Sequence, residues 1–218
     1  RRVDLSFEKG ELIALVGAVG SGKSTFMNSV LGEVRALVGS VHARGKIAFY
    51  SQNTYMVNDT VRGNIIFGNP SDINVSKYEM AVDICALKTD LNALPNGDMC
   101  QVGERGITLS GGQKARIQLA RCVYHDADIY LLDDPLAAVD AHVGKHLFER
   151  CIVDELLLGK GSIWRSASSS PKKRLIVLAT NSLQFLKHPN VSRIVVLKDG
   201  SIDQVGTYSE LSKHGTFR

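Results

Sequence analysis

Short apolar runs bounded by glycine or polar residues recur along the chain and predict the strands of a sheet. The later runs are almost continuously apolar, which is typical of parallel strands that are covered on both faces. After the last run, Asp199–Gly200 is a hairpin turn signal leading into residues 201–206, so one edge of the sheet is expected to be β-rich. The predicted strands are Glu11–Gly17, Gly45–Gln52, Ala127–Asp134, Arg174–Asn181 and Arg193–Lys198.

Helical spacing of apolar residues marks several segments between these strands. Phe26, Met27 and Val30 share one face of a helix after the first strand. Residues Val75–Leu94 have a helical period throughout, and a further helix is expected to begin at the glycine pair after Ser110. The order of elements indicates a single α/β domain over residues 1–218, with a helical subdomain inserted near residues 69–125.

Composition excludes some classes of protein. The formal net charge of +4 is too small to argue for nucleic acid, although it is compatible with binding a nucleotide. The four cysteines lie far apart without a Cys-x-x-Cys pair, so reduced thiols are expected rather than a disulfide framework or a zinc site.

No apolar run approaches the ~18–20 residues that a membrane-spanning helix needs. The chain also lacks an initiator Met and a signal peptide, so we expect a domain excised from a longer protein. Residues 159–173 are rich in serine and lysine and predict a flexible loop, with phosphorylation of the serines as the alternative.

Residues Gly17–Ser24 read GAVGSGKS and fit the phosphate-loop pattern G-x-x-x-x-G-K-[ST]. The glycines let backbone N–H groups turn inward, and the following helix adds the positive end of its dipole. Lys23 is expected to contact the β- and γ-phosphates of ATP, and the Ser24 hydroxyl is expected to ligate Mg²⁺. The predicted ATP-binding residues of this loop are Gly17, Ala18, Val19, Gly20, Ser21, Gly22, Lys23, Ser24 and Thr25.

Two adjacent carboxylates, Asp133 and Asp134, end the predicted strand Ala127–Asp134. Like charges side by side are unfavourable unless a cation lies nearby. In a phosphate-loop site, a carboxylate that ends a second buried strand is the expected partner of Mg²⁺. We assign that role to Asp133.

Further motifs stand in a fixed order around these carboxylates. LSGGQ at Leu109–Gln113 stands at a helix start about twenty residues before them, just after VGERG at Val102–Gly106. Gln52 follows a strand, and AAVD ends at Asp140. Together with the phosphate loop, these motifs resemble the nucleotide-binding domain of ABC transporters over nearly the whole chain. GAVGSGKST, NDTVRGNIIFG and LLDDPLAAVDAHVGKHLFERCI look most like the first such domain of the C subfamily, the multidrug-resistance-associated proteins.

The resemblance implies a RecA-like P-loop NTPase core, a helical subdomain that carries the LSGGQ signature, and ATP and Mg²⁺ as ligands. Gln52 would contact ATP and join Ser24 and Asp133 at the metal, and Asp140 of the D-loop would face a partner domain. In this family two domains sandwich two nucleotides, and the signature contacts the ATP of the partner. The signature residues are Leu109, Ser110, Gly111, Gly112 and Gln113.

The family's architecture implies partners in the same polypeptide, namely a second nucleotide-binding domain and transmembrane domains, with this domain on the cytoplasmic face of a plasma or organellar membrane. The implied function is ATP-driven export of organic anions, drugs or thiol conjugates. The alternative is a regulatory nucleotide sensor in a channel or channel regulator of the same subfamily. A soluble ABC ATPase of DNA repair or translation is disfavoured by the exporter-like VGERG segment.

Two positions depart from the family's pattern. Most members carry Glu after the Mg²⁺-linked Asp and His after a strand-terminal Thr, where this chain has Asp134 and Asn181. Asp134 is one methylene shorter, and a misplacement of roughly 1 Å can cost on the order of 100-fold in rate. Asn181 cannot carry a proton charge. The catalytic residues implied are therefore Asp134, Asn181 and Gln52, in an ATPase whose own site hydrolyses slowly. An adenine-stacking aromatic residue is expected before residue 1.

Overall fold

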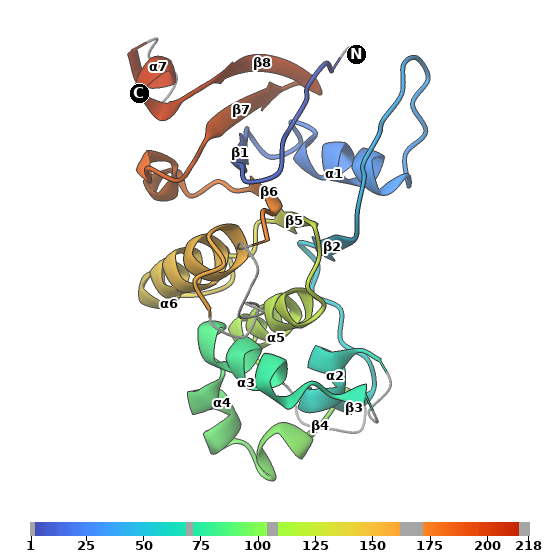
Figure 1. The fold of residues 1–218 in the computed structure, drawn as a ribbon, viewed down its shortest axis with the longest axis vertical. Helices are drawn as coiled ribbons and strands as arrows, with labels where there is room; N and C mark the ends of the chain where they lie inside the picture. Colours follow the sequence, from blue (N-terminus) through green and yellow to red (C-terminus); the bar gives the residue numbers. More distant parts are fainter. Residues whose placement is uncertain (1–2, 69–71, 104–108, 162–171, 214–218) are drawn as a thin grey trace. The chain divides into compact units, whose positions relative to one another are not determined.

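The computed structural model of the chain describes residues 3–68, 72–103, 109–161 and 172–213. Most of the predicted loop at 159–173 and part of the VGERG segment lie outside these ranges. The chain folds as two compact units (Figure 1). The first unit comprises residues 1–49, 127–134 and 173–218, and the second comprises residues 50–126 and 135–172.

A six-stranded sheet with the order β2-β5-β6-β1-β7-β8 forms the centre of the first unit. Strand β1 is parallel to both of its neighbours, so that Ile13 lies opposite Val177 on one side and Arg193 on the other. Strand β8 is antiparallel to β7 across Asp199 and Gly200, which both have positive φ, as a two-residue hairpin requires. The strands are β1 (Leu12–Val16), β2 (Ile47–Tyr50), β5 (Ile129–Asp133), β6 (Leu175–Ala179), β7 (Arg193–Lys198) and β8 (Ser201–Gly206).

Both faces of this sheet are covered, because alternate residues of β1 point into different clusters. Ile13 and Leu15 pack in a cluster that includes Met27 of α1, whereas Ala14 packs with residues of η5 and α7. This arrangement confirms the predicted α/β core and explains why its parallel strands are almost continuously apolar. The helices are α1 (Lys23–Leu31), η5 (Leu183–Lys187) and α7 (Tyr208–Lys213).

Helices make up most of the second unit, which contains the range 69–125 together with residues 135–172. Helix α5 packs against α2 and α3, and η3 continues the chain directly from α6. In the described ranges, no helix is both long and apolar enough to cross a bilayer. The helices are α2 (Val61–Ile66), α3 (Val75–Ile84), α4 (Lys88–Ala93), η2 (Gly97–Met99), α5 (Gly111–Tyr124), α6 (Ala141–His146) and the π-helical η3 (Leu147–Leu157), and the short strands β3 (Asp59–Thr60) and β4 (Gln101–Val102) pair with each other.

The single helix predicted over Val75–Leu94 is wrong, because the segment forms two helices, α3 and α4. Ala86 between them has φ 54°, a left-handed conformation that interrupts a right-handed helix. The turn brings Leu87 to full burial, and its N–H donates to the carbonyl of Val82 at 3.0 Å. The apolar period therefore continues across a break that it does not reveal.

All four cysteine thiols are free and buried. The Cys85 sulfur lies 4.0 Å from that of Cys151, both within the second unit. Burial raises the pKa of the Cys122 thiol to about 12. Burial likewise raises the pKa of Cys85 well above its ordinary value, and the hydrogen bond with Cys151 adds to that shift. Both groups are therefore neutral thiols at physiological pH.

Candidate nucleotide site

The predicted phosphate loop lies between β1 and α1, as the sequence pattern requires. Gly20 has φ 81° and Gly22 has φ 106°, both in the left-handed region where a side chain would be strained. A Cβ atom at Gly17 would clash with the carbonyl oxygen of Leu197 and with the Ser21 side chain. Glycine at these three positions is therefore needed for the loop's path in this fold.

Two groups of the loop suit an anionic ligand. The ammonium of Lys23 donates to the carbonyl oxygens of Gly17 at 2.7 Å and Ala18 at 3.1 Å, which holds the side chain over the loop. The Ser21 hydroxyl is buried, and it has no hydrogen-bond partner in the described part of the chain. Buried polar groups are almost always satisfied, so an orphan here indicates a group that a ligand would complete.

The remaining predicted residues of the loop are more open. Val19 is 94% exposed at its tip, and Thr25 is exposed in the first turn of α1. Neither side chain has a packing role that would explain its place. The phosphate-loop pattern specifies neither side chain, because Val19 is one of its variable positions and Thr25 follows its last residue.

Ser24, the last residue of the phosphate-loop pattern, contacts Asp133 directly. The Ser24 hydroxyl donates to Oδ2 of Asp133 at 2.6 Å, and Asp133, the last residue of β5, is 4% exposed. A hydroxyl and a carboxylate are hard oxygen donors of the kind that Mg²⁺ prefers, so this pair fits the cation. Gln52 is exposed and belongs to the second unit, so its place at the metal stays a prediction.

Asp134, the residue after Asp133, has a left-handed backbone conformation and a carboxyl whose pKa is raised. It has φ 53°, and its N–H donates to the carbonyl of Ala179 at 2.9 Å. Burial raises the pKa of its carboxyl, and the Asp133 charge raises it further. The Lys23 charge and a hydrogen bond from the Asn181 backbone N–H act in the opposite direction on the same pKa. Two carboxylates, one cation and an amide donor thus converge at this end of the sheet.

The Asn181 side chain is exposed, whereas Thr180 before it is completely buried. The Thr180 hydroxyl accepts from the N–H of Ser182 at 3.0 Å, which fixes the turn after β6. The turn places the Asn181 backbone against the Asp134 carboxylate and leaves the Asn181 amide accessible. The sequence pattern concerns the side-chain amide of Asn181, whereas the structure adds a contact from its backbone N–H.

The predicted signature residues open helix α5 in the second unit. Ser110 is the N-cap, and its hydroxyl accepts from the Gln113 N–H at 3.2 Å while the Gln113 side chain accepts from the Ser110 N–H at 2.9 Å. This reciprocal pair is a capping box. Leu109 is buried, Gly111 is exposed, and a Cβ at Gly112 would lie 3.1 Å from the carbonyl oxygen of Ala138.

Asp140, the predicted D-loop residue, caps a different helix. Its Oδ1 accepts from the N–H groups of His142 at 3.0 Å and Val143 at 2.9 Å, at the start of α6. The hydrogen bond from Val143 lowers the pKa of the Asp140 carboxyl, so the cap is anionic at neutral pH. The residue is exposed, and any partner would meet a charged group.

Two polar residues that contact the motifs closely belong to no motif of the sequence. Asp90 of α4 contacts Gln113 and Arg116, and Gln118 of α5 contacts the segment around Gln52. Gln118 is only 3% exposed although it is polar, and a polar residue inside the apolar face of a predicted helix was the available signal. Asp90 offered no such signal, because its partners lie more than twenty residues away in sequence.

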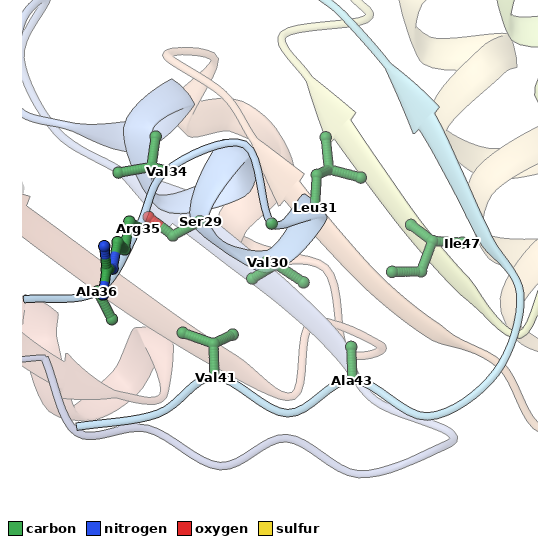
Figure 2. Close-up of a pocket in the computed structure, with 10 residues that line it drawn as sticks. Ser29, Val30, Leu31, Val34, Arg35, Ala36, Val41, Ala43 and Ile47 are labelled. Carbon is green, nitrogen blue, oxygen red and sulfur yellow. The ribbon is translucent and has the colours of Figure 1, made fainter.

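A separate pocket of about 440 Å³ lies beside the C-terminal end of α1 (Figure 2). The labelled side chains that face it are mainly aliphatic and come from α1 and from residues 34–47. Its lining includes none of the predicted phosphate-loop residues Gly17–Thr25.

Comparison with known proteins agrees with the site's chemistry. The family model described as "ABC transporter" matches residues 1–137. The chain is 48% identical over 206 residues to mouse "ATP-binding cassette sub-family C member 4", which covers 94% of this chain and 14% of that protein. It is 45% identical over 210 residues to "ABC transporter C family member 3" of Dictyostelium discoideum, which covers 95% of this chain and 14% of that protein.

Human "ATP-binding cassette sub-family C member 2" is 44% identical over 218 residues, the full length of this chain and 13% of that protein. The chain thus spans about one-seventh of the length of the curated relatives it matches. The family match includes the strand β1 and the loop that build the phosphate site, and it extends past Asp133. The chain belongs to the ABC transporter family, as an ATP-binding domain of the C-subfamily, multidrug-resistance-associated type.

Proposed function

We propose that this chain is the first of two nucleotide-binding domains of an exporter, and that Mg·ATP binding drives its association with the second. The observation that carries the proposal is the 2.6 Å contact between Asp133 and Ser24, the last residue of the phosphate-loop pattern. It joins a metal-binding pair to a loop whose backbone and lysine suit phosphate. The cargo we propose is an organic anion, a drug or a thiol conjugate.

Residues Gly17–Thr25 would hold the phosphates, with Lys23 exchanging its two carbonyl partners for phosphate oxygens. Ser24 and Asp133 would hold Mg²⁺, which supplies charge neutralisation at the β- and γ-phosphates when it is bound. The orphaned Ser21 hydroxyl is a further donor within the same loop. Each of these groups binds or orients, and none of them transfers a proton.

Hydrolysis at this site is proposed to be slow. Asp134 occupies the place of the water-polarising residue with a side chain that is one methylene too short. Asn181 can donate a hydrogen bond through its exposed amide but cannot carry a proton. ATP would therefore stay bound at this site after the two domains have closed.

The partner domain is proposed to meet the N-terminal end of α5. Ser110 and the first N–H groups of this helix form an anion-binding end, and the helix is long enough to present a dipole. Asp140 would contact the same partner. The second domain would then carry out most of the hydrolysis, while this domain supplies the signature.

Nucleotide binding is tested in the full-length protein with a photoreactive ATP analogue and Mg²⁺. We expect photolabelling of this domain to fall at least tenfold in Lys23→Ala, because this variant lacks the positive charge that contacts the phosphates. Lys145→Ala is the matched control, since it removes an exposed lysine of α6 and should label normally. Equal labelling of the two variants would refute the proposed site.

The slow hydrolysis is tested by Asp134→Glu combined with Asn181→His in the full-length protein. We expect ATP turnover to rise roughly tenfold, since the carboxylate moves forward and a protonatable group is added. Asp203→Glu, at an exposed position of β8, controls for the added methylene. Unchanged turnover in the double variant would contradict the assignment of Asp134 and Asn181.

The same weak catalytic residues favour one alternative, a nucleotide sensor that gates a channel. ATP-dependent uptake of a glutathione conjugate into inside-out membrane vesicles is expected for the exporter. An ATP-gated ion current without such uptake would support the sensor instead. Both outcomes leave the ATP site itself in place.

A further inference from the structure

Asp90 of helix α4 connects to the signature residues through a short chain of hydrogen bonds. Its Oδ1 accepts from Nε2 of Gln113 at 3.1 Å, and its Oδ2 accepts from the Arg116 guanidinium at 2.6 Å. Gln113 in turn forms the capping box with Ser110. The Asp90 and Arg116 side chains are 18% and 12% exposed, so this ion pair is largely shielded from water.

The Asp90 carboxylate dictates which way the Gln113 amide points. An ionised carboxylate can only accept hydrogen bonds, so it requires the Gln113 nitrogen to face it. The Gln113 oxygen is then left to accept from the Ser110 N–H, at 2.9 Å. The flipped amide would set two acceptors together at Asp90 and two donors together at Ser110. Asp90 thereby selects the one orientation that completes the cap.

The oriented cap leaves the Ser110 hydroxyl available to a ligand. Its oxygen already accepts from the Gln113 N–H at 3.2 Å, so its own proton is free to be donated elsewhere. The hydrogen bond from the Gln113 amide to the Asp90 carboxylate is stronger than one between two neutral groups, because its acceptor is ionised. Arg116 fixes the second carboxylate oxygen and prevents Asp90 from turning away.

We propose that Asp90 is a positioning residue for the signature end of α5, acting through Gln113 on Ser110. The inference rests on the proposed function, in which this end contacts ATP held by the partner domain. Asp90 does not touch that nucleotide. It holds the donors of the helix end in the geometry that the γ-phosphate needs, so its loss weakens ATP-driven closure and leaves this chain's own phosphate loop intact.

The test uses the full-length transporter and measures ATP turnover against ATP concentration. We expect Asp90→Ala to raise the ATP concentration for half-maximal turnover about three- to tenfold, the range of a lost helix cap. Photolabelling of this chain's own site should not change. The matched control is Asp83→Ala, which removes an exposed carboxylate that pairs with Lys88 on the adjoining segment and should leave both readouts unchanged.

Exchanging the hydrogen-bond donor and acceptor between residues 113 and 90 tests how Asp90 acts. It separates positioning of the residue 113 side chain from stabilisation of the fold by the ion pair of Asp90 with Arg116. Gln113→Glu alone should raise the ATP concentration for half-maximal turnover as much as Asp90→Ala does, because it places a second carboxylate against that of Asp90. Asp90→Asn added to Gln113→Glu should restore it, since the asparagine amide can donate to the new carboxylate and the cap is rebuilt. This pair also carries the test if Asp90→Ala fails to accumulate.

Three results would count against the inference. Normal half-saturation in Asp90→Ala would overturn it, and so would a swap that deepens the defect instead of relieving it. Ser110→Ala distinguishes the source of a failure. If Ser110→Ala impairs half-saturation and Asp90→Ala does not, only the role of Asp90 is lost. If Ser110→Ala has no effect, the proposed function fails and the inference falls with it.

Discussion

Among single residues, Asp134 carries an electrostatic cost in the folded chain, because burial and the Asp133 charge both disfavour its anion. Its pKa is therefore higher in the folded than in the unfolded state, so the folded state binds more protons across that interval and stability falls as pH rises through it. The cost is fully present above the raised pKa and absent below the ordinary value of 3.8. Asp134→Asn removes the titrating group.

We therefore expect Asp134→Asn to raise the melting temperature of the nucleotide-free chain at pH 7, and the gain to vanish as pH falls toward 3.8. Thermal unfolding followed by circular dichroism across this pH range measures it. Asp203→Asn removes a carboxylate from an exposed position of β8 and serves as the control. A gain at pH 7 that persists in acid would contradict the electrostatic explanation.

For single residues, the sequence predicted which residues form the site better than it predicted the burial and contacts of their side chains. The phosphate-loop pattern located Lys23 and Ser24, and the strand-end carboxylate located Asp133, because these depend on local spacing. The pKa of Asp134 is raised by burial and lowered by a hydrogen bond from the Asn181 N–H, which is more than forty residues away in the sequence. No local pattern reports such a contact.

Among the elements, helix α5 of the second unit makes contacts of several kinds. Its N-terminal end carries the capping box, and the buried Gln118 side chain donates to the Ser51 carbonyl and hydroxyl oxygens, both at 3.1 Å. Gln118 also accepts from the Tyr55 N–H at 3.2 Å. One helix thus anchors the segment on both sides of Gln52.

We expect Gln118→Leu to lower the free energy of unfolding by about 1–3 kcal/mol, because it leaves backbone groups of residues 51 and 55 without partners. Denaturant unfolding measures the loss. Gln184→Leu changes the same side chain at an exposed position of η5 and should cost much less. Similar losses in the two variants would show that the anchoring contacts of Gln118 contribute little.

The break between α3 and α4 shows where element prediction stops. Apolar residues keep their helical period across Ala86, so the pattern indicates one helix. The left-handed turn at Ala86 lets Leu87 reach the core, and that choice is made by tertiary packing. Asp90 meets Gln113 only because α4 begins after this turn, which is why the sequence did not reveal their contact.

For the whole molecule, ligand binding and stability are linked, since a ligand that binds only the folded state stabilises it. At an ATP concentration 100 times its Kd, with Mg²⁺, the gain is about 2.7 kcal/mol. For a chain of this size that corresponds to a rise in Tm of roughly 5–10 °C. We expect the rise in the parent chain and its loss in Lys23→Ala, as measured by calorimetry.

Lys145→Ala controls for the loss of a positive charge and should keep the full ATP-dependent shift. Two separate transitions, of which ATP moves only one, would indicate that the two units unfold independently. The moved transition should then belong to the first unit, which contains the phosphate loop. An equal shift in Lys23→Ala would contradict nucleotide binding at this loop.

The burial of all four thiols has a practical consequence for labelling chemistry. Alkylating reagents attack the thiolate, and the raised pKa values of Cys85 and Cys122 leave almost none of it at neutral pH. A maleimide dye should therefore not label the native chain, but it should label a single cysteine introduced at an exposed position such as Val38. Fluorescent reporters of domain closure can be attached without first removing the native cysteines.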